Sequence, residues 1–242
     1  MYNKLMQTTD DFLGGKVRLQ QDKDGLRATS DSVLVAAAVM ARPGDTILDV
    51  GTGNGVIPMC LNARVPDLKI TGLDCQADLL DLAHRNALAN TCHFSPVLAD
   101  IGQCPSPIHG KQYHHVVSNP PFYDEPQLRQ NKQTATAYHQ SVPLKDWLSF
   151  CLRHIRAKGT LTLIHRPDAL PEILSVLNGR LGSLDIIPIQ SKPGEPAKRI
   201  IIRGRMNSHR PLKLYPPLLM HQRNGKRTRE AESLLRAGKA II

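Results

Sequence analysis

The stretch that most constrains the fold is a short apolar run that leads into three closely spaced glycines. Residues 46–50 (Thr-Ile-Leu-Asp-Val) suit a buried parallel strand, and Gly51, Gly53 and Gly55 separate them from an apolar segment over 56–63. Glycines permit positive φ and let a ligand approach the backbone closely. This order predicts an α/β domain that binds a ligand at the turn, the alternative being a glycine-rich turn without a ligand.

Strands and helices alternate along most of the chain. Beyond 46–50 and 56–63, strands are expected over 69–74, 95–100, 113–118, 159–164, 184–190 and 199–205, and helices over 32–40, 76–90, 144–156, 168–178 and 223–239. This alternation predicts a doubly wound, seven-stranded, mostly parallel sheet. The expected division is an N-terminal extension with a small hairpin (1–28), the sheet domain (29–206) and a basic C-terminal segment packed on it (207–242).

The positive charge of the chain is concentrated near its C-terminus. Residues 192–242 hold 13 of the 31 Lys and Arg but only 3 of the 21 Asp and Glu, so they account for the whole net charge of +10. Such a distribution favours contact with nucleic acid over a merely solvated basic tail. The RNA-binding candidates by charge are Arg129, Lys132, Lys198, Arg199, Arg203, Arg205, Arg223, Lys226 and Arg227.

Composition also limits the compartment. The sequence contains no run of about 18 apolar residues, and the first eleven residues lack the apolar core of a signal peptide. The five cysteines are scattered, with no Cys-x-x-Cys pair, which argues against a disulfide framework and a structural zinc site. We therefore expect a cytoplasmic protein with no membrane span and no metal. The oligomeric state is not encoded in any motif, and a monomer is assumed.

Acidic residues follow several predicted strands. Asp49, two residues before the first glycine, would repel a phosphate but could hold a cationic amino-acid group, which favours S-adenosylmethionine over a dinucleotide. Asp74 could accept the ribose hydroxyls or cap the next helix. Asp100 could accept the adenine amine or serve as a turn residue. Asp31 could cap the helix over 32–40 or face the methionine end of the donor.

The fourth strand ends in residues 119–122 (Asn-Pro-Pro-Phe), the predicted catalytic group. Pro120 and Pro121 cannot continue a ladder, so the chain leaves the sheet in a stiff turn. The Asn119 side-chain oxygen and the Pro120 carbonyl could accept hydrogen bonds from an amine, which frees its lone pair to attack a methyl group. Phe122 would stack on the attached planar group, and a base within RNA would have to flip out. The alternative is a strand stop with a buried Phe.

These residues together resemble the class I S-adenosylmethionine-dependent methyltransferases. The matching features are the Asp-x-Gly-x-Gly motif over 49–53, the ribose acid Asp74, the adenine contact Asp100 and the Asn-Pro-Pro-aromatic motif of amino-group methylation. The resemblance implies a Rossmann-like sheet, with S-adenosylmethionine as the methyl donor.

Both ends of the chain resemble a narrower family, the bacterial tRNA (adenine-N6) methyltransferases. The similar segments are 11–17, 25–27, 29–34 and 219–238, whereas residues 137–140 (Ala-Tyr-His-Gln) depart from the Ala-x-His-Glu-like run of that family. The family is known for modifying the adenine beside the anticodon of a valine tRNA. The resemblance implies tRNA as the partner.

Other acceptors remain open from the motif. A protein glutamine amide, guanine N2 in ribosomal RNA and adenine in DNA could all use an Asn-Pro-Pro-aromatic turn. The basic C-terminal segment disfavours a peptide, and the chain has no room for a large DNA-recognition domain. A non-catalytic RNA-binding or donor-sensing protein is a further alternative, against which the intact set of Asn119, Asp49 and Asp74 argues.

Overall fold

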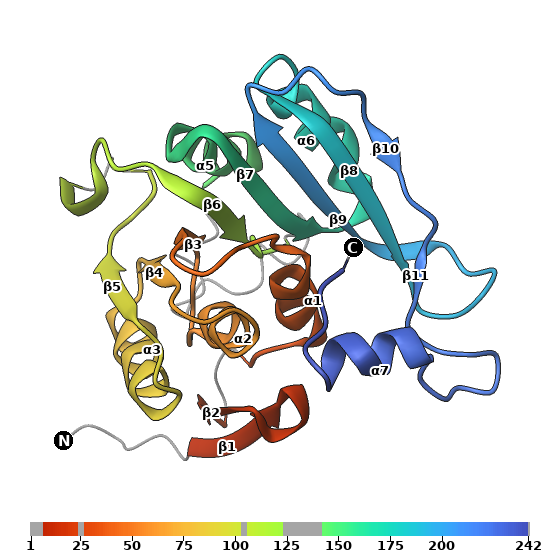
Figure 1. The fold of residues 1–242 in the computed structure, drawn as a ribbon, viewed down its shortest axis with the longest axis horizontal. Coiled ribbons are helices and arrows are strands. Elements are labelled where there is room, and N and C mark those ends of the chain that lie inside the picture. The colour runs from red at the N-terminus through yellow and green to blue at the C-terminus, as the bar shows by residue number, and fades with distance from the viewer. Residues whose placement is uncertain (1–6, 24–26, 103–105, 123–141, 242) are drawn as a thin grey trace, which may run out of the picture.

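A computed structural model describes residues 7–23, 27–102, 106–122 and 142–241, and shows a twisted central sheet with helices on both faces (Figure 1). The sheet strands are β3 (Thr46–Val50), β4 (Lys69–Asp74), β5 (Phe94–Leu98), β6 (Tyr113–Ser118), β7 (Ile155–His165), β8 (Leu181–Gln190), β9 (Ala197–Met206), β10 (Lys213–Leu214) and β11 (Leu218–Leu219). Their order is β10-β8-β9-β7-β6-β3-β4-β5, with β11 also paired to β8.

The predicted fold class is confirmed, but the predicted strand count is wrong. Among the described residues the sheet has nine strands rather than seven, because the two-residue strands β10 and β11 pair with β8. Strands of this length are too short to show a hydrophobic pattern. Strands β3 to β7 are parallel, and β9 runs antiparallel between β7 and β8. The carboxyl ends of β3 to β7 therefore share one edge of the sheet.

The helices cover the two faces of the sheet separately. They are α1 (Ser30–Ala38), α2 (Val56–Arg64), α3 (Ala77–Ala89), α5 (Leu144–Arg153), α6 (Leu170–Leu177) and α7 (Arg229–Leu235), with 3-10 turns η1 (Leu13–Gly15), η2 (Ser106–Ile108) and η5 (Pro167–Ala169). Helices α1, α2 and α3 pack on one face of the sheet over one apolar cluster, and α5 and α6 pack on the other face over a second cluster (Figure 1). No helix in the described ranges is long and apolar enough to cross a membrane.

The N-terminal residues form an antiparallel hairpin of β1 (Gln7–Phe12) and β2 (Val17–Asp22). The hairpin packs against α2 and α3, outside the helical layer (Figure 1). Its side chains alternate, so Val17 and Leu19 are fully buried in the cluster beneath. The hairpin therefore adds a third layer to this side of the domain.

The C-terminal helix is shorter than predicted. Only α7 is helical within 223–239, and it packs against α1. The preceding segment folds back, because Gln222 N donates to the Lys226 carbonyl and Gly225 has a φ of 82°. The Asn-Gly pair at 224–225 favours such a turn and overrides the helix propensity of the neighbouring basic residues. Thr228 then begins the helix by accepting a hydrogen bond from Ala231 N.

Candidate functional site

The predicted strand-end residues meet at the carboxyl edge of the sheet. Asp49 belongs to β3, Asp74 ends β4, Asp100 follows β5 and Asn119 follows β6. A cleft lies at this edge, lined by Gly51, Leu73, Cys75, Ala99, Asp100, Ile101, Val142 and Trp147. Parallel pairing of β3 with both β4 and β6 brings these positions together from distant parts of the chain.

The glycine loop after β3 is fastened to the end of β4. Gly51, Gly53 and Gly55 have φ values of 76°, 55° and 85°, which side chains rarely tolerate. Gly51 N donates to the Leu73 carbonyl at 2.8 Å, and Gly53 N donates to Asp74 Oδ2 at 2.8 Å. The three glycines thus allow a tight turn whose backbone lies against the neighbouring strand.

Trp147, on α5, was not among the residues predicted for the site. A Cβ on Gly51 would lie 2.9 Å from the Trp147 ring, so the first glycine makes room for an aromatic side chain. The indole Nε1 donates to Ser118 Oγ at 2.9 Å, and Ser118 Oγ donates to the Val50 carbonyl at 2.7 Å. Trp147 is 2% exposed and forms a wall of the cleft.

Asp74 has a structural role as well as a predicted ligand role. Its carboxylate is 1% exposed and accepts hydrogen bonds from Gly53 N and, at 3.0 Å, from Gln76 N at the start of α3. Asp74 is not the N-cap of this helix, because Gln76 occupies that position, but its carboxylate joins the glycine loop to the residue that begins α3. Asp100 is exposed and accepts a hydrogen bond from Gly102 N, as a turn residue does, while it also lines the cleft.

Asp49 is the most deeply buried acid of the site. Its side chain is 0% exposed; Oδ2 accepts a hydrogen bond from Thr52 Oγ1 at 2.7 Å, and Oδ1 has no partner within the described chain. Burial raises the pKa of Asp49 to about 7, and the nearby Asp74 carboxylate also raises it, whereas the Thr52 bond lowers it. An unpaired buried carboxylate oxygen fits a cationic ligand group.

Asn119 presents an unused acceptor where the sequence predicts one. Its Nδ2 donates to Ser32 Oγ on α1 at 3.2 Å, which fixes the orientation of the amide. The other end, Oδ1, is buried and makes no hydrogen bond to any described residue. Unpaired buried acceptors are rare and costly, so this oxygen is a candidate partner for a bound amine.

Phe122 lies in a small cluster of polar residues. Its ring centroid is 4.8 Å from that of His165, nearly perpendicular to it, and 4.8 Å from the Arg199 guanidinium carbon. Arg199 Nε pairs with Asp31 Oδ2 at 2.7 Å. Asp31 is not the cap of α1, because Thr29 is the N-cap and Asp31 lies in the first turn of the helix.

His165 was missed, although its position could have revealed it. It ends β7 just as Asn119 follows β6, so the strand-end argument that found Asn119 applies to it equally. Burial lowers the pKa of His165 to about 4, and its cationic neighbours contribute in the same direction. The imidazole beside Phe122 is therefore neutral at pH 7.

Comparison with known proteins places the chain in a family. A model of the methyltransferase small domain matches residues 28–142. The tRNA1(Val) (adenine(37)-N6)-methyltransferase of Flavobacteriaceae bacterium strain 3519-10 is 30% identical over 198 residues, covering 80% of this chain and 83% of the relative. The protein of the same name from Porphyromonas gingivalis ATCC 33277 is 28% identical over 207 residues, covering 81% of each. The chain belongs to the methyltransferase family of these two relatives.

The three-dimensional comparison agrees with this assignment. A solved structure of a predicted O-methyltransferase from Agrobacterium tumefaciens superposes with a TM-score of 0.71 at 25% identity, covering 88% of this chain and 98% of that chain. The resemblance expected from the motifs is thus confirmed, and the protein is an S-adenosylmethionine-dependent methyltransferase. The buried, unpaired Asp49 Oδ1 fits the cationic group of such a donor.

Five of the predicted RNA-binding residues lie on the site edge of the methyltransferase. Lys198 and Arg199 begin β9, beside the end of β7, since Ile200 pairs with His165. The turn with Arg223, Lys226 and Arg227 follows β11, which pairs with the end of β8. These cations therefore extend the edge that carries Asn119 and Phe122.

Of the other predicted RNA-binding residues, the structure describes Arg203 and Arg205, and neither lies on this edge. Arg203 is 6% exposed, pairs with Asp185 at 2.9 Å and donates to the Ala38 and Ile241 carbonyls, so its prediction as an RNA contact is wrong. Its charge completes a buried ion pair instead of facing a phosphate. Arg205 is exposed, but it pairs with Gly182 at the opposite end of β8. Arg129, Lys132 and the run 137–140 lie outside the described residues.

Proposed function

We propose that this methyltransferase transfers the methyl group of S-adenosylmethionine to N6 of an adenine in tRNA, in the cytoplasm. The observation that carries the proposal is the buried, unpaired Oδ1 of Asn119 at the carboxyl edge of the sheet. The hydrogen bond from Asn119 Nδ2 to Ser32 Oγ orients the amide there. The curated relatives are named for N6 methylation of adenine 37 in tRNA1(Val), which supports this acceptor. The basic residues on the same edge support a polyanionic substrate.

The donor half of the site would use the acids at the ends of β3, β4 and β5. Asp49 would hold the ammonium group, Asp74 the ribose hydroxyls and Asp100 the adenine amine of the donor, while the glycine loop lets it approach the backbone. When bound, S-adenosylmethionine supplies an electrophilic methyl carbon. The contribution of the chain is to hold that carbon in line with the acceptor nitrogen.

The acceptor half would use the turn after β6. Asn119 Oδ1 and the Pro120 carbonyl would accept the two N–H groups of the amine, and Phe122 would stack on the base. An amine has two hydrogens for two acceptors, whereas a hydroxyl has one. The pair therefore favours an N-methyl over an O-methyl acceptor. The neutral His165 would contact Phe122 without adding positive charge.

The direct test is to incubate the protein and isotopically labelled donor with total tRNA and to identify the labelled nucleosides by mass spectrometry. We expect labelled N6-methyladenosine. A labelled N2-methylguanosine, or label in a glutamine side chain after incubation with cell protein, would contradict the assigned acceptor and support one of the alternatives that share the motif.

The affinity for the donor is expected to rise as the pH increases through about 7. The ionised Asp49 carboxylate attracts an ammonium group, so binding should release a proton. The raised pKa also means that the folded protein retains this proton between about pH 4 and pH 7, so stability without donor decreases as the pH rises through that window. Calorimetric titration with S-adenosylhomocysteine in buffers of different ionisation enthalpy measures the affinity and the proton release.

Asp49→Asn is the matched variant for this pH dependence. This variant should bind S-adenosylhomocysteine more weakly, and its binding should show neither the pH dependence nor the proton release. An affinity of the unsubstituted protein that stays constant between about pH 6 and pH 8 would rule out the ammonium contact.

The binding of tRNA is expected to weaken steeply with salt. Each phosphate contact contributes a slope of about −0.7 to −0.9 in log K against log salt. Substituting Arg223, Lys226 and Arg227 together by Gln should make the slope shallower by about two. The control is Gln at Arg205, Arg210 and Lys213, which flank the start of β8 at the opposite edge. Equal changes in both triple variants would contradict a site-edge RNA surface.

A further inference from the structure

The N-terminal hairpin is joined to α3 by two side-chain amides. Asn86 Oδ1 accepts from Gln20 N at 2.8 Å, and Asn86 Nδ2 donates to the Gln20 carbonyl at 3.1 Å. Asn90 makes the same two bonds with Arg18, at 3.0 and 2.8 Å. Four residues of helix rise about 6 Å and two residues of strand about 6.7 Å, so the two spacings match. The edge of β2 that does not pair with β1 is therefore hydrogen-bonded to these two side chains at the end of α3.

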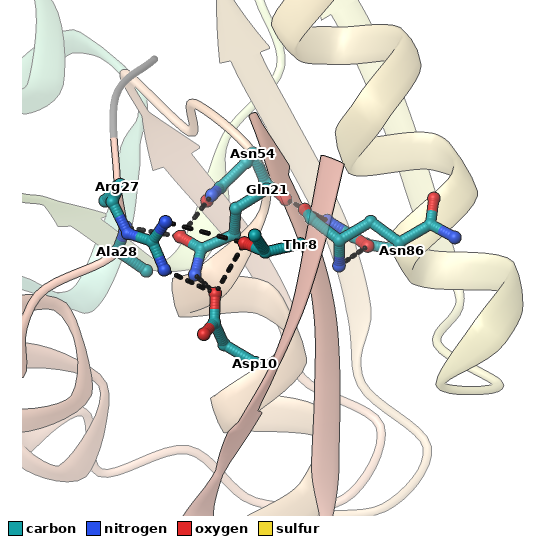
Figure 2. Close-up of polar contacts among 8 residues, drawn as sticks. Thr8, Asp10, Gln21, Arg27, Ala28, Asn54 and Asn86 are labelled. Carbon is teal, nitrogen blue, oxygen red and sulfur yellow. Dashed lines mark hydrogen bonds and ion pairs between the residues drawn. The ribbon is translucent and has the colours of Figure 1, made fainter. Parts of the chain in front are cut away.

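Only one of these two asparagines also contacts the glycine loop. Asn86 Nδ2 donates to the Asn54 carbonyl at 2.9 Å, and the Asn54 side-chain amide donates to Gln21 Oε1 at 3.2 Å (Figure 2). Asn54, which is 4% exposed, stands between Gly53 and Gly55. The loop residue is thus held at its carbonyl from α3 and at its side chain from β2.

Gln21 is itself fixed by a network within the N-terminal residues. It is 1% exposed; Nε2 donates to Asp10 Oδ2 at 2.6 Å, and Oε1 also accepts from Ala28 N at 2.6 Å. Arg27 donates to the same Asp10 oxygen at 2.7 Å (Figure 2). These partners determine which end of the Gln21 amide faces Asn54.

We propose that Gln21 and Asn86 are positioning residues that hold the glycine loop in its donor-binding conformation, which makes the N-terminal hairpin part of the donor site. The inference rests on the proposed donor site at residues 51–55. Three glycines with positive φ give the loop much conformational freedom when it is not fastened. Asp74 fastens Gly53 from β4, and the hairpin side fastens Asn54. A preorganised loop loses less entropy when the donor binds.

The test compares Gln21→Ala and Asn86→Ala with Asn90→Ala in the full-length protein. Asn90 docks the same hairpin on the same helix but does not contact Asn54, which makes it the matched control. Calorimetry with S-adenosylhomocysteine should show a Kd about fivefold to tenfold higher for the first two variants and changed by less than about twofold for Asn90→Ala. Turnover of tRNA at saturating donor should be largely retained.

Two outcomes would overturn the positioning role: an unchanged Kd in Gln21→Ala, or equal weakening by Asn86→Ala and Asn90→Ala. If the unsubstituted protein did not bind S-adenosylhomocysteine, the proposed donor site itself would be wrong. That result differs from a failure of the positioning role alone.

A second pair of variants covers the possibility that the alanine variants fold poorly. Gln21→Glu places two carboxylates in contact and should raise the Kd. Adding Asp10→Asn restores the hydrogen bond between residues 10 and 21 with donor and acceptor exchanged, although Arg27 and Thr8 lose the Asp10 oxygen that they share with Gln21. The double variant should therefore bind S-adenosylhomocysteine more tightly than Gln21→Glu alone. Failure of this rescue in a protein with normal thermal stability would contradict the proposal.

The unsubstituted protein offers an independent readout. If the hairpin contacts favour donor binding, donor binding must in turn stabilise these contacts. S-adenosylhomocysteine should therefore slow hydrogen exchange at the Gln20 amide, which donates to Asn86 Oδ1. An unchanged exchange rate at this amide on saturation with S-adenosylhomocysteine would likewise overturn the coupling between the hairpin and the donor site.

Discussion

Replacing Asn119 with Ala is expected to lower kcat by about 10²- to 10³-fold while donor affinity stays within about twofold. The substitution removes the Oδ1 acceptor, which should act only on the reacting amine, and leaves the glycine loop and the buried acids untouched. The measurement is steady-state methylation at saturating donor and saturating tRNA, together with calorimetric binding of S-adenosylhomocysteine. A kcat within about tenfold of the original would remove Asn119 from the chemical step.

Ser32→Ala is the matched control for Asn119. It removes the hydroxyl that receives a hydrogen bond from Asn119 Nδ2 but leaves the Oδ1 acceptor in place. We expect a loss of less than about tenfold in kcat, which reflects a less firmly oriented amide. Asn119→Asp, which keeps an acceptor oxygen, should likewise retain more activity than Asn119→Ala.

Replacing Asp74 with Ala is expected to weaken donor binding by about 100-fold. The carboxylate accepts hydrogen bonds from Gly53 N and Gln76 N, so its loss loosens the glycine loop and the start of α3 in addition to removing the proposed ribose contact. Charged hydrogen bonds of this type contribute about 1.5 to 3 kcal/mol each, so the free energy of unfolding should also fall by at least about 2 kcal/mol.

Asp78→Ala provides the comparison for Asp74→Ala. Asp78 is an exposed acid in the first turn of the same helix, so its substitution removes the same charge without touching the loop. Its donor affinity should match that of the unsubstituted protein in calorimetry, and its thermal midpoint should fall only slightly. Equal donor affinities for the two variants would show that Asp74 does not contribute to the donor site.

The central strands were predictable because burial on both faces gives them an unmistakable sequence. The predicted bounds of β3, β4 and β6 coincide with the observed ones, and each strand stops where a glycine, an acid or a pair of prolines follows its apolar residues. The end of the chain was harder. A turn at residues 224–225 replaces the start of the predicted helix, and β10 and β11 form only because β8 has an edge with which they can pair.

The site residues divide in a similar way. Those at strand ends could be predicted, because topology alone brings them to one edge. Gln21, Asn86 and Trp147 could not, since each acquires its role from a partner distant in the sequence. Arg203 was misassigned because charge alone does not tell a cation that faces solvent from one that is paired inside the fold.

Trp147 is the single tryptophan of the chain, and it stands against Gly51 in the wall of the donor cleft. Indole emission depends on the polarity around the ring and on the hydrogen bond at its nitrogen, here to Ser118. The protein therefore carries one intrinsic fluorophore at the place where its donor would arrive. Emission from the unlabelled protein can follow occupancy of that cleft in real time, with no competing tryptophan signal from the rest of the fold.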